Sequence, residues 1–303
     1  MRIFRSFEEA AGIPSPIVTT GTFDGVHIGH KTIIRRLNKL ASEHKGESVL
    51  ITFDPHPRAV LYPESVGKGL RLINSQEEKI ELLRKSGLNN VIIIKFTREF
   101  SLTTSETFVR DILCGILKSK VIVVGHNHHF GFNQAGDYRQ LWEWRQRFGF
   151  EAEEIPMQEV EHETVSSTRI RQALSDGYIQ RANAYLDHFY IIIGTARKND
   201  NQLSKEVLFT KIPVTEPTKL VPPPGLYAVS CVADAFFSRG MAFIPKSDNE
   251  LPQLYVHFEA YDHDLPGKRM TLFFHKRLNS YNPAVSPELY LRKGVDEMKE
   301  LIF

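Results

Sequence analysis

Two histidines in a glycine-rich turn are the residues of this sequence best suited to chemistry. The segment GTFDGVHIGH, residues 21–30, places His27 and His30 three positions apart, directly before a stretch with helical periodicity. Both imidazoles can therefore lie on one side of a helix N-terminus, where free N–H groups and the helix dipole attract anions. Imidazoles there can donate hydrogen bonds to phosphate oxygens and stabilise charge that develops during phosphoryl transfer. The cluster predicts a nucleotide site.

Two other interpretations of the histidines are an ordinary surface turn and half of a metal site. The three glycines of the turn, the apolar run before it and the helix after it favour the nucleotide site over a plain turn. A zinc site needs further nitrogen or sulfur ligands. Cys114 and Cys231 are both distant in the sequence, which leaves His126, His128 and His129 as candidates. We expect no metal site in the protein.

An alternation of strands and helices must position this turn. From residue 16 to about residue 156, β-rich runs alternate with amphipathic stretches, which predicts βαβ units around a mostly parallel sheet. The expected strands are 17–20, 48–53, 90–96 and 120–124, and the expected helices are 30–44, 75–87 and 105–119. Ser75 and Glu78 form a capping box sequence, and Gly87 is a stop signal.

Four polar segments fall where such a sheet binds its ligands. Residues 21–30, 54–57 and 125–137 each follow an expected strand, and residues 166–171 open a later helix. Open parallel sheets bind ligands beyond the carboxyl ends of their strands. We therefore expect the four segments to converge on one site.

The chain changes character after residue 186. A helix over 166–177 and a short one over 180–186 precede five β-rich runs at 190–196, 225–235, 237–244, 253–262 and 268–278, and a helix closes the chain at 286–302. This pattern predicts an antiparallel sheet or small barrel. We expect two domains, residues 1–186 and 187–303.

Composition sets the remaining limits. The 303 residues carry a formal net charge of +2, which gives no general attraction for nucleic acid. No stretch approaches the roughly 20 apolar residues of a membrane span, and the first residues, MRIFRSFEEAAG, do not resemble a signal peptide. Two distant cysteines fit a reducing compartment. We expect a cytoplasmic protein that binds neither nucleic acid nor membrane; the sequence leaves its oligomeric state open.

Four segments carry a family resemblance. GTFDGVHIGH, TFDPHPRAVL, GHNHHFGFNQAGD and SSTRIRQAL, in that order, resemble the bacterial bifunctional riboflavin kinase/FMN adenylyltransferases, also called FAD synthetases. The resemblance covers the first 186 residues and is fainter beyond them, in PPPGLYAV and the stretch ending DHDLPGK. It implies a Rossmann-like nucleotidyltransferase domain, followed by a small antiparallel β-barrel of riboflavin-kinase type with a C-terminal helix. The implied reaction transfers AMP from ATP to FMN, giving FAD and pyrophosphate, with Mg²⁺ assisting.

The resemblance also implies site residues. His27, His30 and Arg171 would act on the phosphates as catalytic groups. The residues implied to line the nucleotide and substrate site are Gly21, Thr22, Phe23, Asp24, Gly25, Gly29, His56, Gly125, Asn127, Ser167 and Thr168. Asn127 stands where the family usually has an acid, and Thr22 where it commonly has asparagine. For Ser166 and Ser167 the alternative is plain helix capping, which we expect of one of them in any case, and for Arg171 it is a solvated helix face.

The kinase part departs from the family pattern. Counting from Gly194 aligns the family's G-F-P-T-A-N element with residues 207–212 of this chain. The threonine of the element is kept as Thr210, and its asparagine is replaced by Ile212. Counting back from Gly267 places Tyr255 where the family has a glutamate base, and a phenol of pKa about 10 is a poor base at neutral pH. We expect an adenylyltransferase whose kinase domain keeps its fold and has lost its activity. A fully bifunctional enzyme, still using riboflavin, and an inactive regulatory protein that binds flavin or nucleotide are the alternatives.

Overall fold

The computed structural model describes residues 1–65, 67–126, 128–156, 159–160, 163–198, 208–234, 236–246, 252–259, 265–280 and 287–300. The contacts within the chain divide it into two compact units. The first unit consists of Met1–Leu70 and Lys79–Val165, and the second of Arg71–Glu78 and Ser166–Phe303. The contact boundary after Val165 precedes the predicted domain boundary after residue 186, which stays a prediction.

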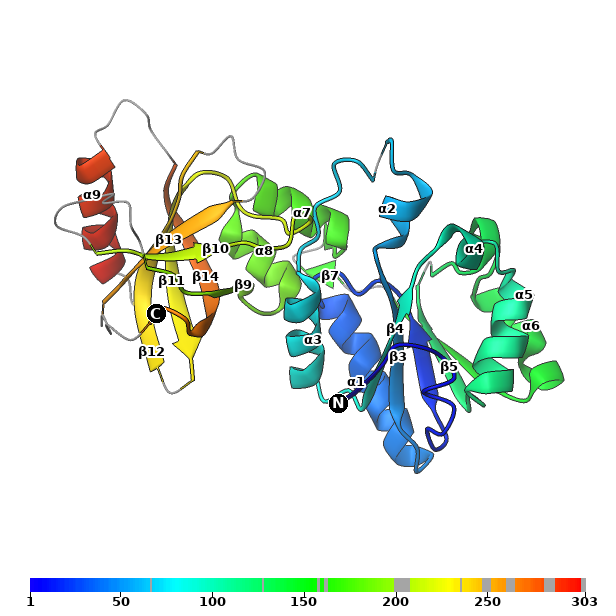
Figure 1. Cartoon of the computed structure of the whole chain (residues 1–303). Coiled ribbons are helices and arrows are strands. Elements are labelled where there is room, and N and C mark those ends of the chain that lie inside the picture. Colours follow the sequence, from blue (N-terminus) through cyan, green and yellow to red (C-terminus); the bar gives the residue numbers. More distant parts are fainter. Residues whose placement is uncertain are drawn as a thin grey trace. The chain divides into compact units, whose positions relative to one another are not determined.

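A six-stranded parallel sheet forms the centre of the first unit (Figure 1). Its strands are β1 (Arg2–Phe4), β2 (Ile17–Thr20), β3 (Ser48–Asp54), β4 (Asn90–Lys95), β5 (Val121–Gly125) and β6 (Glu151–Ile155). Their order is β1-β4-β3-β2-β5-β6, and every pairing is parallel. The predicted parallel sheet is confirmed. The strand order changes direction between β2 and β5, the position where such sheets bind ligands.

Helices lie on both faces of this sheet. The helical elements up to residue 148 are α1 (Ile28–Glu43), α2 (Pro57–Leu61), α3 (Gln76–Lys85), α4 (Arg98–Ser101), α5 (Ser105–Thr107), the π-helix η1 (Phe108–Ile116), the 3-10 turn η2 (Phe132–Gln134) and α6 (Tyr138–Phe148). A short antiparallel pair, β7 (Glu159–Val160) and β8 (Glu163–Thr164), follows β6. The prediction of a single α-helix over 105–119 is wrong. From residue 108 onward the helix has the wider π geometry, in which Leu117 N–H donates to Ile112 O.

Alternate residues of the strands pack into two different apolar cores, one on each face of the sheet. Val18, Ile51 and Val124 pack with the η1 side chains, whereas Leu50 packs with Ile34 of α1 on the opposite face. Continuous apolar runs are expected for strands buried on both faces. This burial fixes the register of the strands and thereby the position of the loops at their carboxyl ends.

A curled antiparallel sheet forms the second unit. Its strands are β9 (Tyr190–Thr195), β10 (Thr210–Pro213), β11 (Gly225–Ala233), β12 (Phe236–Ile244), β13 (Gln253–Phe258) and β14 (Arg269–Ser280), in the order β10-β13-β12-β11-β14-β9. The two edge strands approach each other: Arg197 pairs with Lys211 just beyond β9, and a Cβ at Gly194 would lie 2.7 Å from Ile212 Cγ2. The predicted barrel-type architecture is confirmed.

Three helices accompany this sheet. They are α7 (Ser167–Ser175), α8 (Ile179–Leu186) and α9 (Pro287–Lys299). Tyr290, Leu291 and Val295 of α9 pack in an apolar cluster with Leu226 and Tyr255 of the strands. The C-terminal helix is thus part of the core of the second unit.

The segment Arg71–Glu78 is held in the second unit by backbone pairing and a buried ion pair. Leu72 N–H donates to Thr218 O at 2.7 Å, and Leu220 N–H donates to Leu72 O at 2.8 Å. Lys219 Nζ lies 2.6 Å from Glu78 Oε2, and both side chains are 1% exposed. The sequence pattern does not predict this attachment.

Candidate active site

The predicted turn after β2 stacks three rings at the N-terminus of α1. His27 and His30 have ring centroids 3.6 Å apart, and Phe23 stacks on the other face of His30 at 4.4 Å. His27 is the N-cap residue of α1, with no hydrogen bond from its side chain to the first turn. The predicted side-by-side placement of the two imidazoles is confirmed.

The backbone of the turn adopts conformations that ordinary residues avoid. Phe23, Gly25 and Val26 all have positive φ, at 49°, 91° and 42°. For a β-branched residue such as Val26 this is a strained conformation, and such strain gathers at functional sites. Gly29 lies against the His27 ring, because a Cβ there would be 3.2 Å from His27 Cε1. The glycine therefore allows the close stack.

His30 is a neutral group in this environment. Burial, followed by the neighbouring charges of His27 and Lys79, holds the pKa of His30 well below its ordinary value. Its Nδ1 is buried and has no hydrogen-bond partner among the described residues. A buried polar atom without a partner is rare in a folded protein. The imidazole is suited to donate or accept a hydrogen bond when a ligand binds.

The loops after β3 and β5 reach the same edge of the sheet as the histidine turn, because the strands are parallel. His56 caps α2, and its Nδ1 accepts from Arg58 N–H at 3.1 Å. Gly125 ends β5, and its carbonyl accepts from His128 N–H at 3.1 Å. Asn127 lies outside the described residues, so its predicted role remains a prediction.

The predicted residues of the fourth segment lie on α7, in the second unit. Ser166 caps the helix through its side chain, which accepts from Arg169 N–H at 3.3 Å, so the predicted capping is confirmed. Arg171 Nη2 lies 3.5 Å from Thr168 Oγ1, one turn earlier on the helix. The convergence of Ser167, Thr168 and Arg171 with the loops of the first unit remains a prediction.

Sequence reasoning misses Lys79, which is only 8% exposed. Its Nζ lies 3.3 Å from Thr52 Oγ1 on β3 and 3.5 Å from Thr22 O in the histidine turn. A signal was present, because Lys79 precedes the fully buried Leu83 by four residues and therefore shares its face of α3.

The residues predicted as a degenerate kinase site are all buried, on β10 and β13. Lys211 pairs with Tyr255, and Ile212 pairs with Leu254. Because directly opposed residues share a face and successive residues alternate, Tyr255 faces the side of the sheet opposite to Thr210 and Ile212. The three side chains do not share one site.

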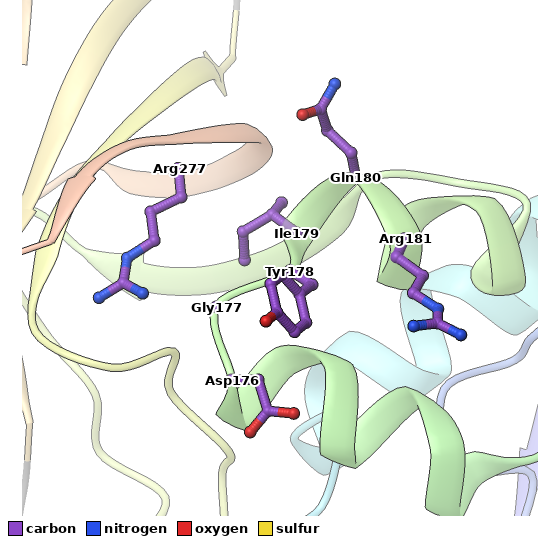
Figure 2. A pocket seen from close by; sticks show the side chains of 7 residues that line it. All are labelled: Asp176, Gly177, Tyr178, Ile179, Gln180, Arg181 and Arg277. Atoms are coloured by element: carbon purple, nitrogen blue, oxygen red, sulfur yellow. The ribbon is translucent and has the colours of Figure 1, made fainter.

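A cavity of about 460 Å³ opens in the second unit between the end of α7, the start of α8 and β14 (Figure 2). Its lining residues are Asp176, Gly177, Tyr178, Ile179, Gln180, Arg181 and Arg277. The Arg277 side chain packs close to Gly177, where a Cβ would lie 2.5 Å from Nη1. None of the predicted site residues lines this cavity.

Two absences apply to the part of the chain that the structure describes. No group of three or more His, Cys, Asp or Glu side chains is arranged to hold a metal ion there. No helix within it is long and apolar enough to cross a membrane.

The open parallel sheet with flanking helices defines an α/β protein with a fold of nucleotidyltransferase type. The family model for FAD synthetase matches residues 12–169, and the chain belongs to that family of enzymes.

Relatives and a solved structure cover the rest of the chain. A bifunctional riboflavin kinase/FMN adenylyltransferase of Listeria monocytogenes is 30% identical over 75% of this chain and 71% of its own length. One from Escherichia coli is 26% identical over 98% of this chain and 96% of its own. A crystal structure described as a macrolide-efflux protein from Streptococcus pneumoniae is 23% identical, with a TM-score of 0.83 over 98% of this chain and 95% of that one. At that identity the likeness shows the fold alone.

Proposed function

We propose that this protein is an FMN adenylyltransferase, which makes FAD by transferring AMP from MgATP to FMN. The observation that carries the proposal is the His27–His30 stack at the N-terminus of α1, beside the point where the strand order reverses. Free N–H groups at a helix start bind phosphates, and the family match gives the reaction class.

In the proposed reaction, a phosphate oxygen of FMN forms a bond to the α-phosphorus of ATP, and the bond from that phosphorus to the bridging oxygen of pyrophosphate breaks. Such transfers need positioning and neutralisation of charge more than covalent catalysis. His27 and His30 would donate hydrogen bonds to the leaving phosphates. Ser167, Thr168 and Arg171 would hold the remaining phosphate oxygens.

The magnesium ion would arrive with ATP. Mg²⁺ is usually held by substrate phosphates and water with one or two protein oxygens, which agrees with the lack of a three-residue metal cluster in the described residues. His27 and His30 could offer only ring nitrogens as ligands, and Mg²⁺ prefers oxygen ligands. We therefore give them no role as metal ligands.

We further propose that the second unit lacks riboflavin kinase activity. Ile212 is fully buried and packs beside Gly194 where the sheet closes. Tyr255 lies in an apolar cluster with α9, and its hydroxyl lies 3.4 Å from Gln253 Oε1. The buried carboxylate of this unit, among its described residues, is Glu78, which is engaged by Lys219. The side chains at the two substituted positions, Ile212 and Tyr255, therefore supply no carboxylate base for a riboflavin hydroxyl.

The competing proposal is a fully bifunctional enzyme. Its support is that relatives called bifunctional match the chain almost from end to end. Glu259, the exposed carboxylate directly after β13, is the carboxylate nearest in sequence to Tyr255. It lies four residues away, roughly 13 Å along an extended strand.

One assay separates these proposals. Flavin-free protein is incubated with ATP and Mg²⁺, once with FMN and once with riboflavin, and products are resolved by HPLC. FAD from FMN and no product from riboflavin is the expected result. FMN or FAD from riboflavin would refute the loss of kinase activity, and no product from either substrate would favour a regulatory protein.

A matched pair of histidine variants tests the site itself. His30→Asn should lower kcat for FAD formation by about 10²–10³, the usual effect of losing a hydrogen bond donor to developing charge. His44, which ends the same helix α1, supplies the control, because His44→Asn makes the same change far from the turn. Equal activities of the two variants would refute the role of His30.

A further inference from the structure

The cavity of the second unit has a basic and aromatic lining that the proposed functions do not use. It lies between the end of α7, the start of α8 and β14, and its volume is about 460 Å³. Pockets that hold small molecules in proteins have volumes of about 300–1,000 Å³. All the lining residues belong to the second unit, so the cavity is formed within that unit alone.

Arg277 brings a fixed positive charge to this cavity. Its Nη2 donates to Pro224 O at 2.9 Å, and its Cζ lies 5.8 Å from the centre of the Tyr227 ring. A Cβ at Gly177 would lie 2.5 Å from Nη1, and a Cβ at Gly225 would lie 3.2 Å from Nε. The guanidinium is therefore held by a hydrogen bond and enclosed by two glycines that leave room for it.

The hydrogen bonds of Arg277 use only part of its guanidinium. Nε is buried and has no partner among the described residues, and of the two terminal nitrogens only Nη2 has a partner among them. A planar guanidinium can bind a phosphate or a carboxylate through more than one nitrogen. Nη1, which lies close to Gly177 at the cavity, is therefore the donor that an anionic ligand could reach.

The other two charged side chains of the lining are engaged along their own helices. The Asp176 carboxylate accepts from Gln172 Nε2 at 2.9 and 3.0 Å. Arg181 Nε donates to the Tyr185 hydroxyl at 2.8 Å. Two arginines and one aspartate give the lining a net charge of +1. The charge of the lining therefore favours an anion, and Arg277 is the group placed to bind it.

Tyr178 adds an exposed aromatic ring to the lining. It is the N-cap residue of α8, a position where Ser, Thr, Asp or Asn usually caps the first turn, but its side chain makes no capping hydrogen bond. The residue is 60% exposed, and Figure 2 shows its ring projecting from the turn between α7 and α8. Exposed aromatic rings are surfaces on which nucleotide bases stack.

We propose that this cavity is a binding site for a mononucleotide, in which Arg277 binds the phosphate and the Tyr178 ring stacks on the base. A bare phosphate would leave the ring unused, and an uncharged ring system would leave the guanidinium unused. The amide of Gln180, also in the lining, can donate and accept hydrogen bonds at the polar edge of a base. The inference does not rest on the proposed adenylyltransferase function, because the two sites share no residue.

Photolabelling of the full-length protein with 2-azido-AMP is the first test. Trypsin cleaves after Arg171 and Arg181, so one peptide, residues 172–181, contains all the lining residues except Arg277. Mass spectrometry should find saturable labelling of this peptide, and unlabelled AMP should abolish it. The absence of saturable labelling from the peptide would overturn the inference.

A matched pair of variants on β14 tests the phosphate contact. Arg277→Met should raise the concentration of 2-azido-AMP needed for half-maximal labelling by about tenfold, because a charge-assisted hydrogen bond typically contributes this much. Lys276→Met removes a charge at the neighbouring exposed position and should leave that concentration unchanged. Arg277→Lys, which keeps the charge and loses the fork, replaces Arg277→Met if the latter does not fold, and it should also weaken labelling. Equal values for the variants at 276 and 277 would overturn the role of Arg277.

Competition experiments test whether both parts of the ligand are recognised. Inorganic phosphate and adenosine should each need a concentration at least about ten times that of AMP to displace the label, because stacking and the phosphate contact each contribute about that factor. If phosphate or adenosine displaces the label as well as AMP does, the assignment to a mononucleotide is overturned.

A variant of the first unit separates this inference from the proposed function. His30→Asn should leave the labelling of peptide 172–181 unchanged. Loss of labelling in His30→Asn would mean that the peptide reports on the proposed adenylyltransferase site, and it would overturn a separate site in the cavity. If the wild-type protein makes no FAD, the proposed function fails, whereas the labelling still decides whether the cavity binds a mononucleotide.

Discussion

Removal of Lys219 should destabilise the second unit through the loss of a buried ion pair. Lys219 Nζ contacts Glu78 Oε2 and donates to Ile73 O at 2.6 Å and to Ile191 O at 2.9 Å. It also lies 4.2 Å from the centre of the Tyr190 ring. This one ammonium therefore joins the segment Arg71–Glu78 to the strands of the unit.

The magnitude follows from what Lys219→Met would leave behind. Glu78 would keep hydrogen bonds from Ser75 N–H at 2.8 Å and Ile193 N–H at 2.9 Å, but its charge would remain buried without a counter-ion. Removing one partner of a buried ion pair typically costs 3–5 kcal/mol. We expect a loss of about 4 kcal/mol. At 2–4 °C per kcal/mol, the Tm of this unit should fall by about 8–16 °C.

Urea unfolding and calorimetry of the full chain provide the assay. Lys276→Met, at an exposed position of β14, is the control and should change the free energy of unfolding by less than about 0.5 kcal/mol. The double variant Glu78→Gln with Lys219→Met should recover at least about 1 kcal/mol of the summed single losses, because neither residue then carries an unpaired charge. A loss below 1 kcal/mol for Lys219→Met, or strictly additive losses, would refute the reasoning.

Two further predictions concern a glycine and a histidine. Gly177→Ala should cost about 1 kcal/mol more stability than Gly267→Ala: both positions have positive φ, at 81° and 91°, but only at Gly177 would the new Cβ meet a side chain, that of Arg277. Denaturation of both variants decides this, and equal losses would contradict it. Burial, with a smaller effect of His129, lowers the pKa of His128 to about 4, below its unfolded value of about 6.5. The unfolded chain then binds the proton more readily than the folded chain. The contribution of His128 to stability is therefore fully present above pH 6.5 and is lost as pH falls toward 4, and the loss reaches about 2 kcal/mol at pH 5. Wild type should therefore lose more stability than His128→Gln between pH 7 and pH 5, and parallel losses would argue against it.

The central strands could be predicted from the sequence because they are buried on both faces. The expected ranges 17–20, 48–53, 90–96 and 120–124 agree with β2, β3, β4 and β5 to within one residue at each end. The capping box was a second reliable local signal: Ser75 N–H donates to Glu78 Oε2, and Glu78 N–H donates to Ser75 Oγ at 3.2 Å. Signals of this kind depend on near neighbours in the chain.

Elements at the rim of the sheets could not be predicted in the same way. β6 has the sequence EAEEI and lies at the edge of the parallel sheet, where charged residues protect an exposed strand and remove the apolar pattern. Glu153 of β6 is bound by Arg36 of α1 through two hydrogen bonds, at 2.6 and 2.7 Å. The sequence of β6 therefore shows no apolar alternation, and the residue that binds Glu153 lies in a distant part of the chain.

The candidate site shows the same division between local and distant information. The paired histidines were predictable, because residues three apart at a helix start share a side. For Lys79 the sequence signals only the shared helix face with Leu83, because its partners, Thr52 and the Thr22 carbonyl, come from other parts of the chain. Its neighbour Glu78 was assigned only a capping role.

The Glu78 carboxylate serves the capping box and the tertiary structure at once. Oε2 accepts from Ser75 N–H and contacts Lys219, while Oε1 accepts from Ile193 N–H. The capping box alone explains the first of these contacts and would be equally satisfied on an exposed helix end. Successive residues of a helix point about 100° apart, so Glu78 and Lys79 are buried on different sides of α3 and belong to different units. Two adjacent charged residues that look like a solvated helix start are therefore each required by a separate core.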